Sequence, residues 1–571
     1  MVVACRGGRA RNLNQGREMS SAMQRNRFPA SPGGRYLLAA ASLALALAGI
    51  TSGTAQAGTA ATGGPAPLVV RTDHGLVRGL DQHGAREFLG IPYAAPPVGP
   101  NAWRPPQPFP PWRGVRAATK PGHDCAQTGS LATGVPTTSL FENCLFLNVY
   151  TPPRQAGHPL PVMVWIHGGG FTGGAGRIYD GAVLAARRHV IVVTINYRLS
   201  AFGFLALPSL DAESPDNSSG NYGLMDQQAA MRWVQNNAFA FGGDPGKVTI
   251  FGESAGGASV CANMASPTAL GLFAHAIAES GCIFPTPGKK AAERQGAALA
   301  KSLGCTSAAT AAACMRTKPA AVILKAEPSG GLSWGPVSGG FTLPLSPLRA
   351  FETGRYLHVP LLQGTNHDEG RFFVGIEFDV LGHHPLTAAQ YPRVVAAQFG
   401  AKAAPAIVAH YPLKAFASPD LAFAKVLTDS EFSCPALLAD ILTERSGTYA
   451  YEFSDPAPPN DFGIKFTFPL GAAHSTELQY VFGRVPLLDT VPTFKPDQAA
   501  LSAQMMGYWT RFAATGNPNA GPAPRWPRFG GSNPQLQELI PKATAPESAT
   551  VFAGFHQCAF WATIEGQGRP R

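Results

Sequence analysis

The sequence has little charge: only 14% of its 571 residues are Asp, Glu, Lys or Arg, whereas 45% are hydrophobic. Such a chain can bury a large core and is not intrinsically disordered. The net charge of +10 suggests a nucleic-acid partner, but residues 1–57 hold seven Arg and one Glu and so carry most of the excess. The rest of the chain has no run of Lys and Arg, so we expect no nucleic-acid binding.

Long apolar runs are also missing, apart from one near the N-terminus. There an Arg-rich stretch ends at Arg35, an apolar run of Leu and Ala follows up to Ile50, and small residues end at Ala57. This order is typical of a signal peptide over residues 1–57, with Met19 and Met23 as alternative starts. The run is short for a membrane span. The sequence therefore predicts export, to the periplasm or the medium, without stable membrane insertion.

Cysteine is scarce, at nine residues, and forms neither C-x-x-C pairs nor a dense cluster with histidine. The sequence therefore predicts no metal site. One cysteine lies in the leader, which leaves an even number in an exported chain, as expected of disulfide bonds. Counting alone cannot pair these eight residues. They are Cys125, Cys144, Cys261, Cys282, Cys305, Cys314, Cys434 and Cys558.

The chain after the leader predicts one α/β domain. Residues 58–67 are rich in Gly, Ala, Thr and Pro and are predicted to be a flexible linker, and nothing in 68–571 resembles another linker or a repeat. Short runs that are apolar on both faces predict buried parallel strands. These runs are 161–166, 190–195, 248–251 and 359–362. Helical periodicity at 225–236 and 501–513 completes an alternation typical of a large, mostly parallel sheet flanked by helices.

The motif Gly252-Glu253-Ser254-Ala255-Gly256 carries the strongest chemical signal. It follows a predicted strand and leads into a run of small residues with helical character. A serine on a sharp strand-to-helix turn exposes its hydroxyl, and glycine on either side avoids clashes. The context therefore favours Ser254 as a nucleophile over an ordinary turn.

A second motif, His167-Gly168-Gly169-Gly170, directly follows the predicted strand 161–166. Successive glycines let backbone N–H groups point at one spot, as an oxyanion hole requires. We assign the N–H groups of Gly169, Gly170 and Ala255 to this role. The alternative is a phosphate-binding loop, but no Lys-Ser/Thr pair follows the glycines.

A serine nucleophile needs a base, and in α/β-hydrolases the acid and then the histidine follow the serine in the chain. Residues 364–370 place Asp368 and Glu369 after the predicted strand 359–362, where active sites of such sheets form. Spacing does not choose between these two acids. It does not choose among the later histidines either, which include His383, His384, His410, His474 and His556.

Several motifs in order resemble the type-B carboxylesterase family, which includes the cholinesterases. Residues 88–93 and 96–99 are similar to its N-terminal signature, and 142–148 are similar to its E-D-C-L-x-L-N element. Residues 241–245 lead into the nucleophile segment as they do in that family. The resemblance covers nearly the whole mature chain. It implies an α/β-hydrolase fold with helical insertions above an active-site gorge. Residues 285–350 and 385–450 are helical and irregular in pattern, and we expect them to be insertions that cover the edge of the sheet.

The resemblance also implies roles for particular residues. The acid loop matches with Glu369 as the triad member, and residues 471–483 match the segment that bears the catalytic histidine, here His474. The cysteine pairs implied are 125 with 144, 305 with 314, and, as the remaining pairs, 261 with 282 and 434 with 558. The family needs no cofactor. The loop between Cys125 and Cys144 holds no Trp or Tyr, so we do not expect recognition of choline esters.

The sequence thus predicts a secreted serine esterase that transfers the acyl group of a small-molecule ester to water. A serine hydrolase preferring amides or carbamates is one alternative. A cholinesterase-like adhesion protein with a dead site is another, but the chain keeps all three triad positions and the glycine loop.

Overall fold

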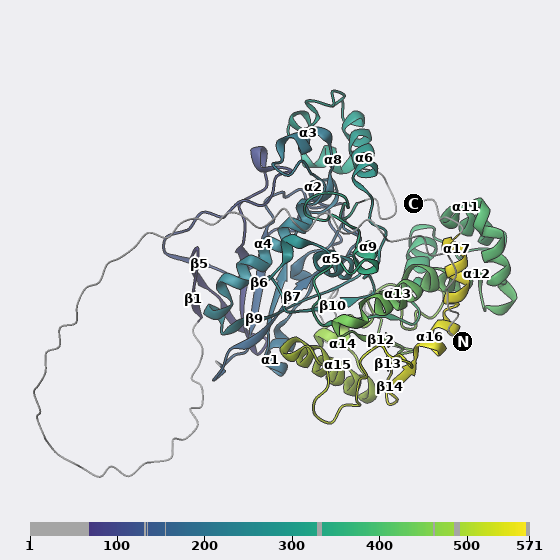
Figure 1. Ribbon diagram of the computed structural model, residues 1–571. Helices are drawn as coiled ribbons and strands as arrows, with labels where there is room; N and C mark the ends of the chain where they lie inside the picture. The colour runs from purple at the N-terminus through teal and green to yellow at the C-terminus, as the bar shows by residue number, and fades with distance from the viewer. Residues whose placement is uncertain are drawn as a thin grey trace, which may run out of the picture. The chain divides into compact units, whose positions relative to one another are not determined.

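The computed structural model describes residues 68–130, 133, 135–154, 156–327, 334–460, 463–484 and 492–566 (Figure 1). These residues belong to one compact unit. The signal peptide and the linker expected at 1–57 and 58–67 lie outside them. Within the described residues, no helix is long and apolar enough to span a membrane.

An eleven-stranded sheet forms the centre of this unit, in the order β14-β13-β12-β11-β10-β9-β7-β8-β6-β4-β3. The strands from β8 to β13 in that order run parallel, and the pairings outside them are antiparallel. The bounds are β3 Leu80–Gln82, β4 Ala85–Pro92, β6 Phe146–Thr151, β7 Leu160–Ile166, β8 Ile191–Ile195, β9 Gly243–Glu253, β10 His275–Glu279, β11 Leu361–Asn366, β12 Tyr449–Phe453, β13 Gln535–Leu539 and β14 Ala545–Ser548. Strands β1 (Val69–Thr72), β2 (Gly75–Arg78) and β5 (Val115–Ala117) form a separate small sheet.

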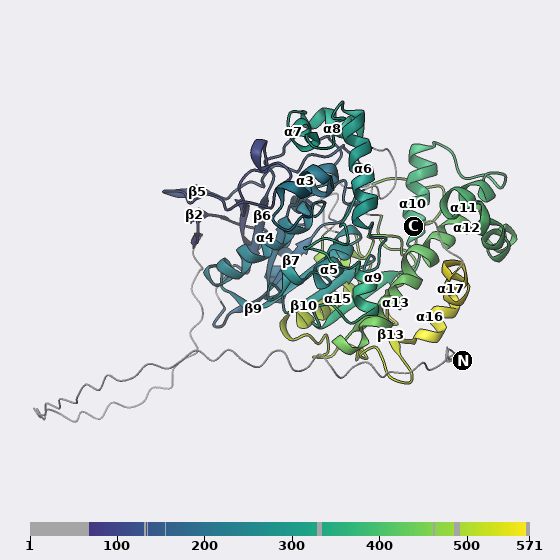
Figure 2. The same cartoon turned by 45° about the horizontal axis from the view of Figure 1, so that its top comes forward.

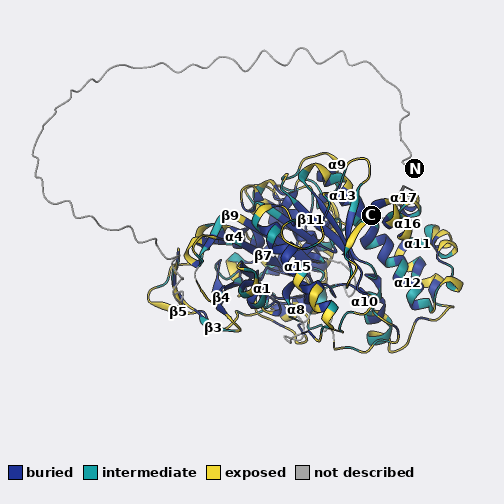
Figure 3. Ribbon diagram, turned by 90° about the horizontal axis from the view of Figure 1, so that it is seen from below, coloured by how far each residue is buried: buried dark blue, intermediate teal, exposed yellow. Residues whose placement is uncertain are grey.

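Both faces of the sheet are covered, as the doubly apolar strands require. Alternate residues of β7 point to opposite faces: Val162, Val164 and Ile166 join the core with α4 (Tyr222–Asn237) and α5 (Ala255–Met264). Met163 and Trp165 join the core with α1 (Ala182–Arg188) and α15 (Pro496–Thr515). Seen from below, the buried strands lie between these two helical layers (Figure 3).

The remaining helices lie mainly in the two insertions and at the C-terminus, where Figure 2 shows α6, α7 and α8 together, and α11 beside α12. The helix α13 packs on β11 and also contacts α9 and α16. The bounds of these remaining helices are α2 Ser200–Phe204, α3 Pro208–Glu213, α6 Lys289–Ser302, α7 Ala311–Met315, α8 Ala320–Ala326, α9 Pro347–Glu352, α10 Gly370–Val374, α11 Tyr391–His410, α12 Pro419–Leu427, α13 Cys434–Thr443, α14 Leu478–Phe482, α16 Ala549–Phe555 and α17 Cys558–Gly566. Two π-helical segments, η6 (Gly375–Leu381) and η8 (Thr428–Ser433), lie next to α10 and α12.

The predicted strands and helices are present, with one shift. The strand expected at 359–362 begins at Leu361, after Pro360, which has no N–H to give to a neighbouring strand. It continues through Gln363, Gly364 and Thr365 to Asn366, all of them buried, because β10 and β12 pair with both edges and α13 and η8 pack against the strand. Apolar patterning therefore misses the half of β11 that leads to the acid loop.

The expectation of disulfide bonds is confirmed by four bridges in the structure. Cys125 pairs with Cys144, Cys261 with Cys282, Cys305 with Cys314, and Cys434 with Cys558. The first holds a loop beside the glycine-rich turn after β7, and the last ties α13 to the start of α17.

Candidate active site

Ser254 occupies the sharp turn between β9 and α5. Its backbone has φ 58° and ψ −123°, a strained conformation for a residue with a side chain. The turn fits because its neighbours are glycines: a Cβ on Gly256 would lie 2.0 Å from the carbonyl oxygen of Ile166, and one on Gly252 would lie 2.5 Å from the same atom. Such a turn presents the serine side chain at the carboxyl end of the central strands, where ligands bind in sheets of this kind.

Glu369 follows β11 and lies at the start of α10, fully buried. Its Oε1 accepts hydrogen bonds from the Thr365 hydroxyl (2.9 Å) and the Asn366 N–H (2.7 Å). Its Oε2 lies 2.6 Å from Nδ1 of His474. Both oxygens of the carboxylate are therefore engaged, and the imidazole is fixed with Nε2 directed away from Glu369.

The other ring nitrogen of His474 meets a second carboxylate. Nε2 lies 3.0 Å from Oε1 of Glu253, the residue next to Ser254, and this oxygen also accepts a hydrogen bond from Ser475 Oγ at 2.6 Å. No hydrogen bond of the Ser254 hydroxyl is found within the described part of the chain. The structure thus brings Glu369 and His474 together and places the histidine against the neighbour of Ser254.

The two carboxylates decide the charge of the imidazole. Burial by itself lowers the pKa of His474, but the charges of Glu253 and Glu369 and their contacts to the ring outweigh it and hold the pKa well above its ordinary value. The protonated imidazole between two carboxylates is therefore the favoured form. The ring has to lose this proton before it can accept one from a serine hydroxyl.

The glycine-rich turn after β7 lies directly against Ser254. A Cβ on Gly168 would lie 3.1 Å from that of Ser254, and Gly169 and Gly170 have φ values of 98° and 63° that favour glycine. Within the described residues, no hydrogen bond uses the N–H of Gly169 or Gly170. The N–H of Ala255 opens α5, where helical N–H groups have no partner in the helix. All three predicted oxyanion donors therefore belong to segments next to the serine.

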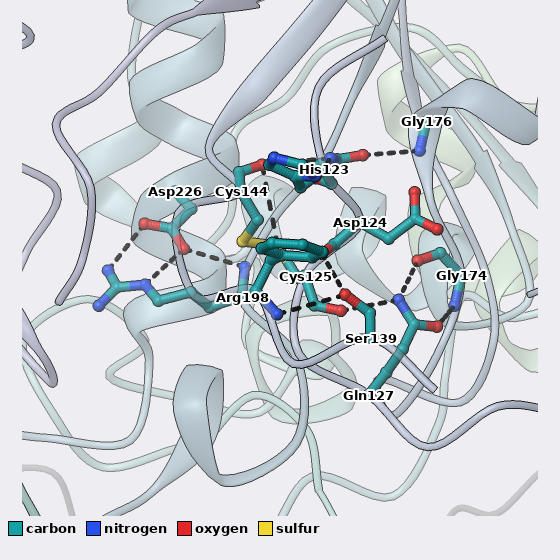
Figure 4. Close-up of a disulfide and its surroundings, with 12 residues drawn as sticks. His123, Asp124, Cys125, Gln127, Ser139, Cys144, Gly174, Gly176, Arg198 and Asp226 are labelled. Carbon is teal, nitrogen blue, oxygen red and sulfur yellow. Dashed lines mark hydrogen bonds and ion pairs between the residues drawn. A yellow bond between two sulfur atoms is a disulfide. The ribbon is translucent and has the colours of Figure 1, made fainter. Parts of the chain in front are cut away.

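A side chain from the first disulfide loop braces this turn (Figure 4). Gln127, fully buried, donates to the carbonyl of Gly174 (2.9 Å) and accepts from its N–H (2.8 Å). Asp124, directly before this loop, forms a two-fold contact with Arg177 at 2.6 and 2.7 Å. The loop closed by Cys125 and Cys144 thus fixes the far end of the glycine turn.

Aromatic rings also pack against His474. The rings of Phe373 and Phe432 lie 4.8 and 5.0 Å from the imidazole, centroid to centroid, and Phe284 packs edge-on against Phe432 at 5.7 Å. Phe284 and Phe373 are partly exposed. These rings form an apolar, uncharged wall beside His474.

The model of the carboxylesterase family matches residues 66–561, nearly everything that follows the leader. The chain belongs to the carboxylesterase family. It is 34% identical over 541 residues to a fumonisin B1 esterase of Sphingopyxis macrogoltabida, covering 92% of this chain and 93% of that protein. It is 37% identical over 482 residues to a para-nitrobenzyl esterase of Bacillus subtilis (strain 168), covering 81% and 92%.

Solved structures agree with the sequence comparison. A para-nitrobenzyl esterase structure superposes with a TM-score of 0.71 at 34% identity, covering 86% of this chain and 99% of the other. The predicted α/β-hydrolase fold and the predicted class of carboxylic ester hydrolase are thereby confirmed. The chain is a carboxylesterase with a mixed sheet flanked by helices.

Sequence reasoning missed the further carboxylates behind the site of this carboxylesterase. Glu253 stands inside the nucleophile motif, so an acid adjacent to the serine was the available signal. Glu279 ends β10 and Glu477 precedes α14, and both are fully buried. Burial raises the pKa of Glu279 to about 8, and burial together with the neighbouring glutamates raises the pKa of Glu477 well above its ordinary value. Nothing in the sequence next to Glu279 or Glu477 indicates that these carboxyl groups are buried with a raised pKa.

Proposed function

We propose that this carboxylesterase cleaves its substrates through an acyl-enzyme on Ser254, with His474 as general base and Glu369 as the acid that orients it. The observation that carries the proposal is the fixed Glu369–His474 pair, 2.6 Å apart, held against the neighbour of a strained serine turn. This pair supplies the base and the orienting acid that activation of a weak nucleophile requires.

In the first half-reaction, neutral His474 takes the proton of Ser254 as its oxygen attacks the ester carbonyl. The N–H groups of Gly169, Gly170 and Ala255 hold the negative oxygen of the tetrahedral intermediate. The bond to the alcohol then breaks, and the alcohol leaves with the proton from His474. Throughout, Glu369 keeps Nδ1 protonated and stabilises the imidazolium.

In the second half-reaction, water replaces the alcohol. His474 takes a proton from the water, the resulting oxygen attacks the acyl-enzyme, and the acid leaves as the proton returns to Ser254. Apart from the substrate and water, every group that takes part belongs to the chain.

The wall beside His474 favours neutral esters with apolar or aromatic groups. Three of its members, Phe284, Phe373 and Phe432, bring no charge, and a small apolar cluster around Phe372 and Ala473 adjoins them. The curated relatives are named for esterase activity on a para-nitrobenzyl ester and on fumonisin B1, and a rat relative is named a pyrethroid hydrolase. We infer that this chain acts on small neutral esters, not on choline esters.

The same proposal includes export of a single catalytic domain. The arrangement of residues 1–57 supports a signal peptide, 58–67 a linker and 68–571 the domain. Four disulfide bonds are compatible with an oxidising compartment.

The test is hydrolysis of p-nitrophenyl esters of graded acyl length by the parent and by Ser254→Ala. We expect the variant to lose activity by roughly 10⁴-fold or more, because removing a triad nucleophile leaves only binding and the oxyanion hole. The matched control is Ser139→Ala, which removes a hydroxyl from the disulfide loop and should keep most of the activity. Full activity in a folded Ser254→Ala would overturn the assignment of the nucleophile, and paired ester and amide substrates would test the alternative preference for amides.

A further inference from the structure

A second cluster of ionisable side chains lies on the far side of the acid loop and takes no part in the proposed reaction. His367 Nδ1 lies 3.1 Å from Oε1 of Glu452, and His556 Nε2 lies 2.8 Å from the same oxygen. The three donor atoms all lie within 4.8 Å of one another. Glu452 and His556 are buried, while the side chain of His367 keeps 32% of its surface exposed. The cluster is therefore enclosed on one side and accessible on the other.

The buried histidine is oriented as metal-bound histidines are. Nδ1 of His556 lies 2.7 Å from Oδ1 of Asp429 and 3.2 Å from Nζ of Lys425, and Nε2 is directed toward Glu452. Donation from Nδ1 to Asp429 would leave Nε2 free to bind a metal. Asp429 is itself held by Lys425 at 2.6 Å and by the Tyr411 hydroxyl at 2.9 Å. A carboxylate that fixes the tautomer of a ligating histidine is the usual outer partner of a zinc ligand.

The sheet gathers an excess of carboxylates at this point. Glu452 on β12 is the register partner of Glu538 on β13, so both side chains lie on one face. On β14, Glu547 is the register partner of Leu536, diagonal to Glu538 on that face. Oε2 of Glu547 is buried and has no hydrogen-bond partner among the described residues. Like charges on neighbouring strands repel, so a cation at this place would stabilise the sheet.

We propose that His367, Glu452 and His556 form a binding site for one divalent transition-metal ion, with zinc as the best fit. Two imidazole nitrogens and one carboxylate oxygen are a set that zinc accepts, with water in the fourth position. Calcium and magnesium prefer oxygen ligands, so they fit poorly. Rotation of the half-exposed His367 ring closes the set, and the ring protons that point at Glu452 leave to solvent as the metal binds.

This site would join parts of the chain that are distant in sequence. His367 lies two residues before Glu369, Glu452 belongs to β12, and His556 lies two residues before Cys558. In Figure 1 the C-terminal helices α16 and α17 lie on the same side of the molecule as α12 and the strand β14. The metal would therefore bind the C-terminal segment to the base of the acid loop and act on stability, not on the chemical step.

The experiment uses untagged, exported protein stripped with a chelator. Zinc binding is followed by calorimetry and metal content, and the melting temperature is measured with zinc and with calcium. Three variants test whether zinc binds at this site. His367→Gln removes a ligand and Asp429→Asn removes the hydrogen-bond partner of His556. His384→Gln is the control, because it removes an exposed histidine on another segment. Cobalt-loaded parent protein supplies a visible spectrum that reports the coordination without any variant.

We expect one zinc ion per chain and a higher melting temperature with zinc but not with calcium. We expect binding to be weaker by about 10- to 100-fold in Asp429→Asn, by at least as much in His367→Gln, and unchanged in His384→Gln. Absence of zinc binding by the stripped parent would overturn the proposal. So would equal affinity of parent and His367→Gln, or an equal effect of calcium. If the variants do not fold, a cobalt spectrum of six-coordinate, water-like character in the parent overturns it, and a four-coordinate spectrum supports it.

Discussion

At the scale of single residues, the position of His474 between two carboxylates has a direct consequence for pH dependence. A general base works only when it is neutral, and the charges of Glu253 and Glu369 favour the protonated ring by raising the pKa of His474. In Glu253→Gln one of these charges is gone. The pKa of His474 should then fall, so the neutral ring persists to lower pH.

We therefore expect the acid limb of kcat/KM to move to lower pH in Glu253→Gln, because one of the two charges that raise the pKa of His474 is lost. The measurement is the pH profile of p-nitrophenyl ester hydrolysis. Asp368→Asn is the matched control, because Asp368 lies in the acid loop but pairs with Arg371 and the N–H of Ala472 instead of His474. An acid limb that stays in place or moves upward in Glu253→Gln would contradict the role assigned to this carboxylate.

Glu279 is expected to link stability to pH. Burial raises its pKa from 4.5 to about 8, although the Trp509 N–H donates to Oε1 at 3.0 Å and lowers it. The unfolded chain loses this proton above about pH 4.5, so folding must take up a proton between pH 4.5 and 8. The folded state therefore becomes less favourable as pH rises through this interval.

Glu279→Gln keeps an acceptor for Trp509 but has no proton to lose. We expect parent and variant to differ little in free energy of unfolding at pH 5, and the variant to be the more stable at pH 8, by on the order of 4 kcal/mol. Urea unfolding at several pH values measures this, with Glu352→Gln on the exposed side of α9 as control. A difference that does not change with pH would show that Glu279 is ionised in the folded protein.

At the scale of elements, the sequence predicts best what is continuous in the chain. The β9–Ser254–α5 turn could be predicted because strand, motif and helix follow one another within about twenty residues. The contact of His474 with Glu253 could not, since it joins the end of β9 to the segment between β12 and α14, more than 200 residues later in the chain. The half of β11 that lacks apolar residues was missed for the same reason, because its burial comes from pairing with β10 and β12 and from packing against α13 and η8.

The disulfide loop offers a test of how one element positions another. Gln127→Ala removes both hydrogen bonds to Gly174 and so loosens the turn that carries Gly169 and Gly170. Because these donors act mainly on the transition state, we expect kcat to fall roughly tenfold with little change in KM. Ser139→Ala in the same loop loses a bond to the Asp124 carbonyl but none to Gly174, and should leave kcat unchanged. An equal fall in both variants would mean that the loop acts only on stability.

At the scale of the whole molecule, the disulfides differ most in the length of chain they enclose. Cys434–Cys558 closes a separation of 124 residues, whereas Cys305–Cys314 closes one of 9. The chain enclosed by this long bridge contains β12, His474 and α15, and the bridge itself joins α13 to the C-terminal helix α17. Counting cysteines could not identify this bridge, because partners so far apart leave no local pattern, and only the resemblance to a family implied it.

A cross-link stabilises a protein mainly by restricting the unfolded chain, and a longer loop restricts it more. Without zinc, we expect the double variant Cys434→Ala/Cys558→Ala to lose about 5 kcal/mol and Cys305→Ala/Cys314→Ala about 3 kcal/mol at most. Thermal unfolding of the two variants, each compared with the parent, shows which bridge contributes more to stability. Hydrolysis at low temperature shows whether the site survives, and it should, because neither bridge contacts Ser254. If the short bridge proves the more important, native packing around α7 outweighs the entropy of the unfolded chain.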